Sequence, residues 1–115
     1  MANRRIVLGT NGRHSLRGVS AISPAEFLAY QDETDSLTYV IDAANYLETA
    51  TISSVIRTAS SLTVTSASNT TTTATQRLKG TGYVDIKLTL STGEVDQFRI
   101  TVRERVNQIV TDAYT

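Results

Sequence analysis

The chain has 115 residues, of which 40% are hydrophobic and 19% charged, and its formal net charge at pH 7 is zero. This length and composition suit one domain with one core. No apolar run approaches the roughly 20 residues that a membrane helix needs, and the balanced charge does not favour non-specific binding to nucleic acid. We therefore expect neither a membrane nor a nucleic-acid partner. Cysteine is absent, which excludes disulfides and thiolate metal sites.

The first 22 residues show no sustained hydrophobic periodicity and contain glycine-rich turn signals, so they are predicted to form an extended arm. They lack the long apolar region of a signal peptide. The arm is basic, with Arg4, Arg5, Arg13 and Arg17 preceding any acidic residue. Such an arm could dock on the acidic surface of a neighbouring copy, or its charges could simply be solvated.

A helix start is predicted at Ser23-Pro24-Ala25-Glu26, because serine can cap a helix, proline suits its first position and Glu26 completes a capping box. The helix is expected to be a short turn near residues 24–30, ended by the acidic stretch Gln31–Ser36. Residues 1–36 are therefore assigned to an N-terminal arm with a short helix.

From Leu37 onward the pattern is that of β-structure. The clearest part is Tyr83–Arg105, where apolar and polar residues alternate on both sides of a short loop containing Gly93. This period of two predicts a β-hairpin with one buried and one solvated face. Further short strands at intervals of about ten residues predict an all-β sandwich of about seven strands over residues 37–105. Residues 106–115 remain as a C-terminal tail.

The sequence contains no recognisable catalytic or metal-binding constellation. His14 is the only histidine and has no partners for a triad or a metal site, so an exposed or interface histidine is the simpler interpretation. Asp32, Glu33 and Asp35 lack the spacing of a calcium-binding loop. We therefore predict a protein that is not an enzyme and uses no metal or other cofactor.

Several motifs together resemble a known family. The matching segments are Leu47-Glu48-Thr49-Ala50-Thr51-Ile52-Ser53-Ser54, Leu62-Thr63-Val64, Thr71-Thr72-Thr73-Ala74-Thr75, Leu78-Lys79-Gly80, Leu90-Ser91-Thr92-Gly93-Glu94 and Phe98-Arg99-Ile100-Thr101-Val102-Arg103-Glu104-Arg105. In this order they resemble the small fibre–tail adaptor proteins of tailed bacteriophages. The resemblance implies an Ig-like β-sandwich and a structural role in the virion.

The leading hypothesis is therefore a non-enzymatic adaptor that forms a multi-copy ring in the phage tail or neck. It would be made in the host cytoplasm and join the tail to fibres or to neighbouring tail components. The partners expected are other virion proteins and further copies of the chain. The candidate interface residues, chosen from charge and from their distance from the expected core, are Arg4, Arg5, Arg13, His14, Arg17 and Tyr114.

Two other functions remain open at this point. An Ig-like domain with arms would also suit a capsid decoration (cement) protein, which differs from a tail adaptor in its copy number. A carbohydrate-binding β-sandwich for host attachment would need exposed aromatic residues that stack on sugars. Tyr83 and Tyr114 are the candidates for that role.

Overall fold

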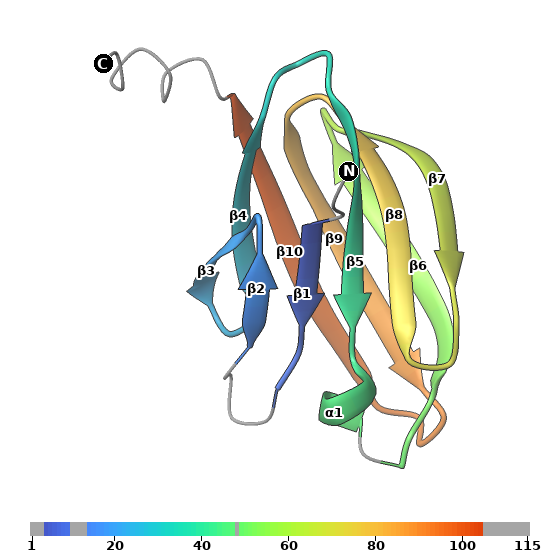
Figure 1. The fold of residues 1–115 in the computed structure, drawn as a ribbon. Coiled ribbons are helices and arrows are strands. Elements are labelled where there is room, and N and C mark those ends of the chain that lie inside the picture. The colour runs from blue at the N-terminus through green and yellow to red at the C-terminus, as the bar shows by residue number, and fades with distance from the viewer. Residues whose placement is uncertain (1–3, 10–13, 48, 105–115) are drawn as a thin grey trace.

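The computed structural model describes residues 4–9, 14–47 and 49–104, which form two five-stranded β-sheets packed face to face (Figure 1). Sheet A has the strand order β2-β1-β5-β8-β7, and sheet B has the order β3-β4-β10-β9-β6. The predicted all-β sandwich is therefore confirmed. The Ig-like assignment stays a prediction.

The strands are β1 (Arg4–Val7), β2 (Ser15–Arg17), β3 (Ser20–Ser23), β4 (Glu26–Gln31), β5 (Ser36–Asp42), β6 (Ile52–Ser60), β7 (Thr63–Asn69), β8 (Thr73–Lys79), β9 (Gly82–Leu90) and β10 (Val95–Glu104). One short helix, α1 (Ala44–Leu47), follows β5. Six of these ten strands, β5 to β10, correspond to the region expected to hold about seven, and the other four come from the region predicted to be an arm.

The core lies between the sheets and is built by the alternation seen in the sequence. In the β9–β10 hairpin, every second residue is buried from Val84 to Leu90 and from Phe98 to Val102, while the residues between them are partly or fully exposed. The other strands supply the rest of the apolar layer. The largest fully buried apolar side chains are Tyr39, Phe27, Ile6, Leu8, Ile41, Leu78, Ile86, Leu88 and Ile100.

The N-terminal region is part of both sheets. β1 runs parallel to β5, and β4 runs parallel to β10. Ile6 on β1 and Phe27 on β4 are fully buried. The described part of residues 1–36 is therefore not an arm outside the domain, and the predicted boundary at residue 36 is wrong. The proposed tail, residues 106–115, lies outside the described residues.

The short helix predicted near residues 24–30 is also wrong. Residues 24–25 form a turn between β3 and β4, and Glu26–Gln31 is a strand. Phe27, Ala29 and Gln31 alternate inward along this strand and are buried. Pairing with β10 and burial of this face outweigh the local capping signal, which involves few residues and little free energy.

Tyr39 on β5 is the centre of a buried polar network. Its hydroxyl donates to Oε1 of Gln31 at 2.8 Å and accepts from Nη1 of Arg4 at 2.8 Å. The Gln31 amide in turn donates to the backbone carbonyls of Leu78 (3.2 Å) and Gly80 (2.9 Å). The network therefore ties β1 and β5 of sheet A to β4 of sheet B and to the β8–β9 turn.

A second buried glutamine contacts the same tyrosine. The side-chain amide of Gln76 donates to the backbone carbonyl of Tyr39 at 2.8 Å, and its Oε1 accepts from Nε of Arg57 at 2.9 Å. Gln31 and Gln76 are the buried polar side chains of the described residues, and no buried side-chain nitrogen or oxygen there lacks a partner. Since an unpaired buried polar group costs free energy, Tyr39 is central to stability.

Gly82 begins β9 at a position that no other residue fits. Its φ is +136°, and a Cβ there would lie 2.2 Å from the Ser60 carbonyl oxygen and 2.8 Å from Cβ of Ser61. By contrast, Gly93 in the β9–β10 turn has a φ of +92° and open space around it. Gly82 is therefore required by close backbone packing, and Gly93 only by its backbone conformation.

The substitution Tyr39→Phe should lower the free energy of unfolding by about 1–3 kcal/mol, because it leaves Oε1 of the buried Gln31 without a donor. Urea unfolding of the full chain measures this. The matched control is Tyr83→Phe, since the Tyr83 hydroxyl has no hydrogen-bond partner among the described residues. This control should change stability by less than about 0.5 kcal/mol. Equal losses in both variants would contradict the role assigned to Tyr39.

The pair Gly82→Ala and Gly93→Ala should differ sharply in thermal unfolding. Gly93→Ala meets only backbone strain, which costs about 1–2 kcal/mol. Gly82→Ala adds a collision with the backbone of residues 60–62 and should cost about 3 kcal/mol or more. If both variants melted at the same temperature, the close approach at Gly82 would be wrong.

Candidate interaction surfaces

The predicted interface residue Arg4 is turned toward the interior of the sandwich. Its guanidinium lies 5.5 Å from the centre of the Tyr39 ring and donates to the Tyr39 hydroxyl. A cation above an aromatic face, held by a hydrogen bond in a partly buried site, stabilises the packing of β1 on the domain. Arg4 therefore fastens the N-terminal strand to its own chain.

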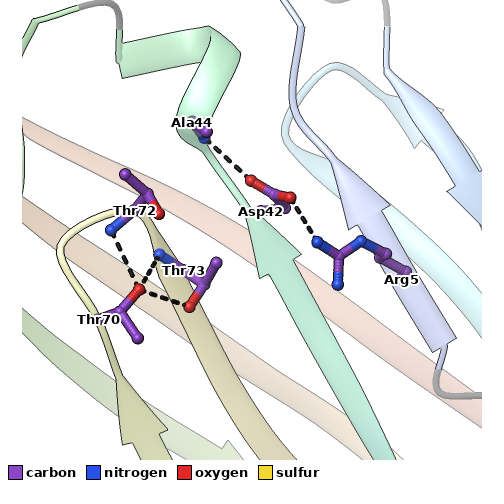
Figure 2. Close-up of polar contacts among 6 residues, drawn as sticks. All are labelled: Arg5, Asp42, Ala44, Thr70, Thr72 and Thr73. Carbon is purple, nitrogen blue, oxygen red and sulfur yellow. Dashed lines mark hydrogen bonds and ion pairs between the residues drawn. The ribbon is translucent and has the colours of Figure 1, made fainter.

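Arg5 is paired within the same domain. Its Nη2 lies 2.5 Å from Oδ2 of Asp42, the last residue of β5, and the other carboxylate oxygen accepts from the backbone N of Ala44 at 3.1 Å (Figure 2). Asp42 thus pairs with a cation on β1 and caps the first turn of α1. Arg17 lies opposite Arg5 in the β1–β2 pair and is exposed, although it too has a contact within the chain.

His14 bonds to Gly9, which follows β1, and to the turn between β3 and β4. Its Nδ1 accepts from the backbone N of Gly9 at 3.1 Å, and Nε2 lies 2.7 Å from the Pro24 carbonyl oxygen. A neutral imidazole protonated at Nε2 satisfies both contacts. Its ring packs 5.5 Å from that of Phe27. His14 therefore holds the start of β2 against the β3–β4 turn.

The structure thus gives Arg4, Arg5 and His14 intramolecular partners that sequence reasoning did not foresee. Along the sequence, Tyr39 is 35 residues from Arg4, Asp42 is 37 residues from Arg5, and Pro24 is 10 residues from His14. No local sequence motif predicts contacts between residues this far apart along the chain. The other two candidates, Arg13 and Tyr114, lie outside the described residues.

One end of the sandwich, around α1, is built from turns that are bonded to one another. Oγ1 of Thr70 accepts from the backbone N of Thr72 (3.2 Å) and of Thr73 (3.0 Å), and it also bonds the Thr73 hydroxyl (Figure 2). The carbonyl of Thr72 accepts from Ala43, and that of Thr71 from Ile52. The threonine run therefore forms a side-chain-capped turn that ties α1 and β6 to the β7–β8 turn.

Tyr46 on α1 makes a further link at this end. Its hydroxyl donates to Oδ2 of Asp96 on β10 at 2.5 Å, and its ring meets Phe98 edge-on at 6.2 Å. The hydrogen bond to Asp96, followed by burial and by the charges of Asp96 and Glu94, raises the pKa of Tyr46 to about 12. The helix is thereby fixed to the β9–β10 hairpin.

A charged cluster lies on the outer face of sheet B. Arg99 on β10 makes two hydrogen bonds to the Asp85 carboxylate on β9, at 2.7 and 3.0 Å, and its guanidinium stacks 3.9 Å from the centre of the Tyr83 ring. The hydrogen bond to Asp85 raises the pKa of Arg99. Because Arg99 covers one face of the ring, Tyr83 is a poor platform for stacking a sugar.

The surface of the described residues includes two open grooves. The smaller, of about 260 Å³, adjoins the Arg99–Asp85 pair and the β3–β4 turn. The larger, of about 740 Å³, lies where β7 begins, and hydroxyl side chains dominate its lining. Its lining residues are Glu33, Thr34, Ser61, Thr63, Thr65, Lys79, Gly80 and Thr81. Each groove contains both acidic and basic groups, so neither selects a ligand of one charge.

Among the described residues, no group of three or more histidine, cysteine, aspartate or glutamate side chains is placed to hold a metal ion. The described part of the chain contains no helix that is long and apolar enough to span a membrane.

Comparison with known families matches residues 31–103 to the family described as Podophage GP4 fiber-tail adaptor protein gp77. The matched span begins at the last residue of β4 and includes all of β5 to β9 and nearly all of β10. Comparison with curated proteins and with solved structures found no match. The N-terminal strands β1 to β3, which complete the two sheets, precede the matched span.

The bond between Tyr46 and Asp96, which lies inside this span, predicts a pH effect on stability. A pKa raised from 10.0 to about 12 on folding gives stability that is complete below pH 10 and is lost as the pH rises toward 12. The advantage of the wild type over Tyr46→Phe should therefore shrink across that interval in urea unfolding. In the Asp96→Asn variant, ultraviolet absorbance should show this tyrosine ionising closer to pH 10. An unchanged titration in Asp96→Asn would refute the assignment.

Proposed function

Because the chain belongs to the podophage GP4 fiber-tail adaptor family, we propose that it joins the phage tail to fibres or to neighbouring tail components. The observation that carries this proposal is the family match over residues 31–103, which covers most of both sheets. The proposed partners are other proteins of the virion, and the proposed location is the tail or neck. The chain is made in the host cytoplasm and assembles there into particles.

The role we propose is mechanical and not catalytic. An adaptor must hold its partners in a fixed relation, so it benefits from a body whose loops and strands do not move independently. The bonds of Arg4 to Tyr39 and of Arg5 to Asp42 support this view, because they fix the N-terminal strand to sheet A. The capped turn at Thr70 and the Tyr46–Asp96 bond do the same for the α1 end.

We further propose that several copies form a closed ring. A ring needs two different surfaces on each copy, one that binds the preceding subunit and one that binds the next. Of the interface residues expected from the sequence, Arg13, Arg17 and Tyr114 are retained as proposed contacts. Arg4, Arg5 and His14 act indirectly, by positioning the strands that carry such contacts.

Cryo-electron microscopy of purified virions, with mass spectrometry of the same particles, tests this function. The expected result is a closed ring of a few copies at the tail or neck, in contact with fibre or tail proteins. A lattice of many copies over the capsid would instead identify a decoration protein. Absence of the chain from the particle would refute a virion role altogether.

A further inference from the structure

The two lateral sides of the sandwich end in very different edge strands. On one side, the edges are β2 and β3, with three and four residues (Figure 1). On the other side, they are β6 and β7, with nine and seven residues. Short edges are one of the ways by which proteins prevent unwanted strand pairing. The β2–β3 side therefore has a protection that the β6–β7 side lacks.

The long side has few of the other protections. Each of its strands has one register shift, between Ile52 and Ser54 in β6 and between Val64 and Ser66 in β7, so residues 54–60 of β6 remain a regular edge. Residues 52–69 contain no proline, lysine, aspartate or glutamate, and their single charged residue is Arg57. That side chain is occupied, since it donates to Oε1 of the buried Gln76 and to the carbonyl of Ser68 on β7. An edge of this length that has no proline, and whose one charged side chain is held by contacts within the domain, is a ready template for another strand.

β6 is the better acceptor of the two long edges. The side chain of Ile56 on β6 is 53% exposed and lies on the outer face of sheet B, beside Lys87 of β9. A strand added along β6 could cover that side chain, and burial of apolar surface would add to the new backbone hydrogen bonds. β7 offers no comparable apolar anchor, because its exposed residues are serine, threonine, alanine and asparagine.

We propose that residues 106–111 of a second copy add as a strand to the free edge of β6, joining successive copies head to tail. This inference rests on the proposed function, which requires several copies, and it names the segment that links them. Residues 106–111 of each copy pair with the β6 edge of the next copy. The β6 edge of that first copy pairs in turn with residues 106–111 of the copy before it.

The sequence points to this segment as the donor. Of the parts of the chain outside the described residues, only 105–115 is long enough to form a strand of ordinary length. Residues 106–111, with the sequence Val-Asn-Gln-Ile-Val-Thr, carry no charge and are rich in the β-branched residues that favour strands. A six-residue strand spans about 20 Å and leaves Arg105 and the last four residues as connection and end.

The chain geometry favours a tail from another copy over the copy's own tail. β9 lies between β10 and β6 in sheet B. A tail leaving Glu104 would have to cross the start of β9 to reach its own β6. Ser61 pairs with Tyr83 at that place, and the Ser60 carbonyl packs against Gly82. A tail entering from a neighbouring copy meets no such crossing.

Variants of the full chain test the acceptor edge. Ile56→Lys places a charge on the β6 edge and should abolish the concentration-dependent association of the purified protein, as measured by sedimentation velocity. Thr58→Lys, also exposed on β6, should do the same. The matched control is Ile22→Lys on the short edge β3, because Ile22 is likewise 53% exposed. The control should associate as the wild type does, and circular dichroism verifies that each variant is folded.

The donor is tested by Ile109→Lys, with Thr115→Lys as the control within the same tail. Ile109→Lys alone should remain a monomer of 12.5 kDa. Mixing it with Ile56→Lys restores one intact edge and one intact tail, so the mixture should form a dimer of the two variants and nothing larger. Monomers in the mixture would mean that the tail does not bind in trans, which overturns the proposal.

Normal association of Ile109→Lys, or a wild type that stays monomeric at every concentration, would overturn it too. None of these failures affects the location of the chain in the virion. That location is determined from intact particles, so a failure of the proposed function remains distinguishable from a failure of this inference.

Discussion

The need to satisfy polar groups inside an otherwise apolar sandwich is the constraint on which this structure depends. Tyr39 meets it through both its hydroxyl and its carbonyl. The hydroxyl donates a hydrogen bond to Gln31 and accepts one from Arg4, and the backbone carbonyl accepts one from Gln76. These contacts reach strands of both sheets, so a shift of one sheet relative to the other would break several buried hydrogen bonds at once. Since each buried unsatisfied group costs about 1–3 kcal/mol, the network specifies how the two sheets are stacked.

This constraint also determines the role of the N-terminal region. The cations of Arg4 and Arg5 are used to attach β1, and the imidazole of His14 is used to attach the turns beside β2 and β3. Strands β1 to β4 then cover the edges of β5 and β10 that would otherwise be open. One side of the domain therefore ends in the short edge strands β2 and β3. The other side ends in the long edge strands β6 and β7, and there we propose that a second copy binds.

This difference between short and long edge strands suits an adaptor, because it leaves one side of the domain more available for strand pairing. Hydrogen bonds fix the turns at Thr70 and at α1. The long edge of β6, whose single charged residue Arg57 is hydrogen-bonded within the domain, offers backbone hydrogen bonds in a defined direction. Direction matters in an assembly of identical copies, because a closed ring requires two distinct surfaces that fit each other. Pairing along a strand edge supplies both a surface and an orientation.

The sequence by itself determined the all-β class, the β9–β10 hairpin and the resemblance to fibre–tail adaptors, because alternation along a strand is a local property that can be read residue by residue. Only the tertiary structure decided the conformation of residues 4–9 and 14–36. The capping pattern at Ser23 suggested a helix, yet β4 forms because Phe27, Ala29 and Gln31 find a buried face beside β10. In the same way, the sequence did not indicate that Arg4 and Arg5 bind Tyr39 and Asp42, which lie far from them along the chain. Contacts between residues far apart along the chain are settled by packing and by the satisfaction of buried polar atoms, and no local pattern contains that information.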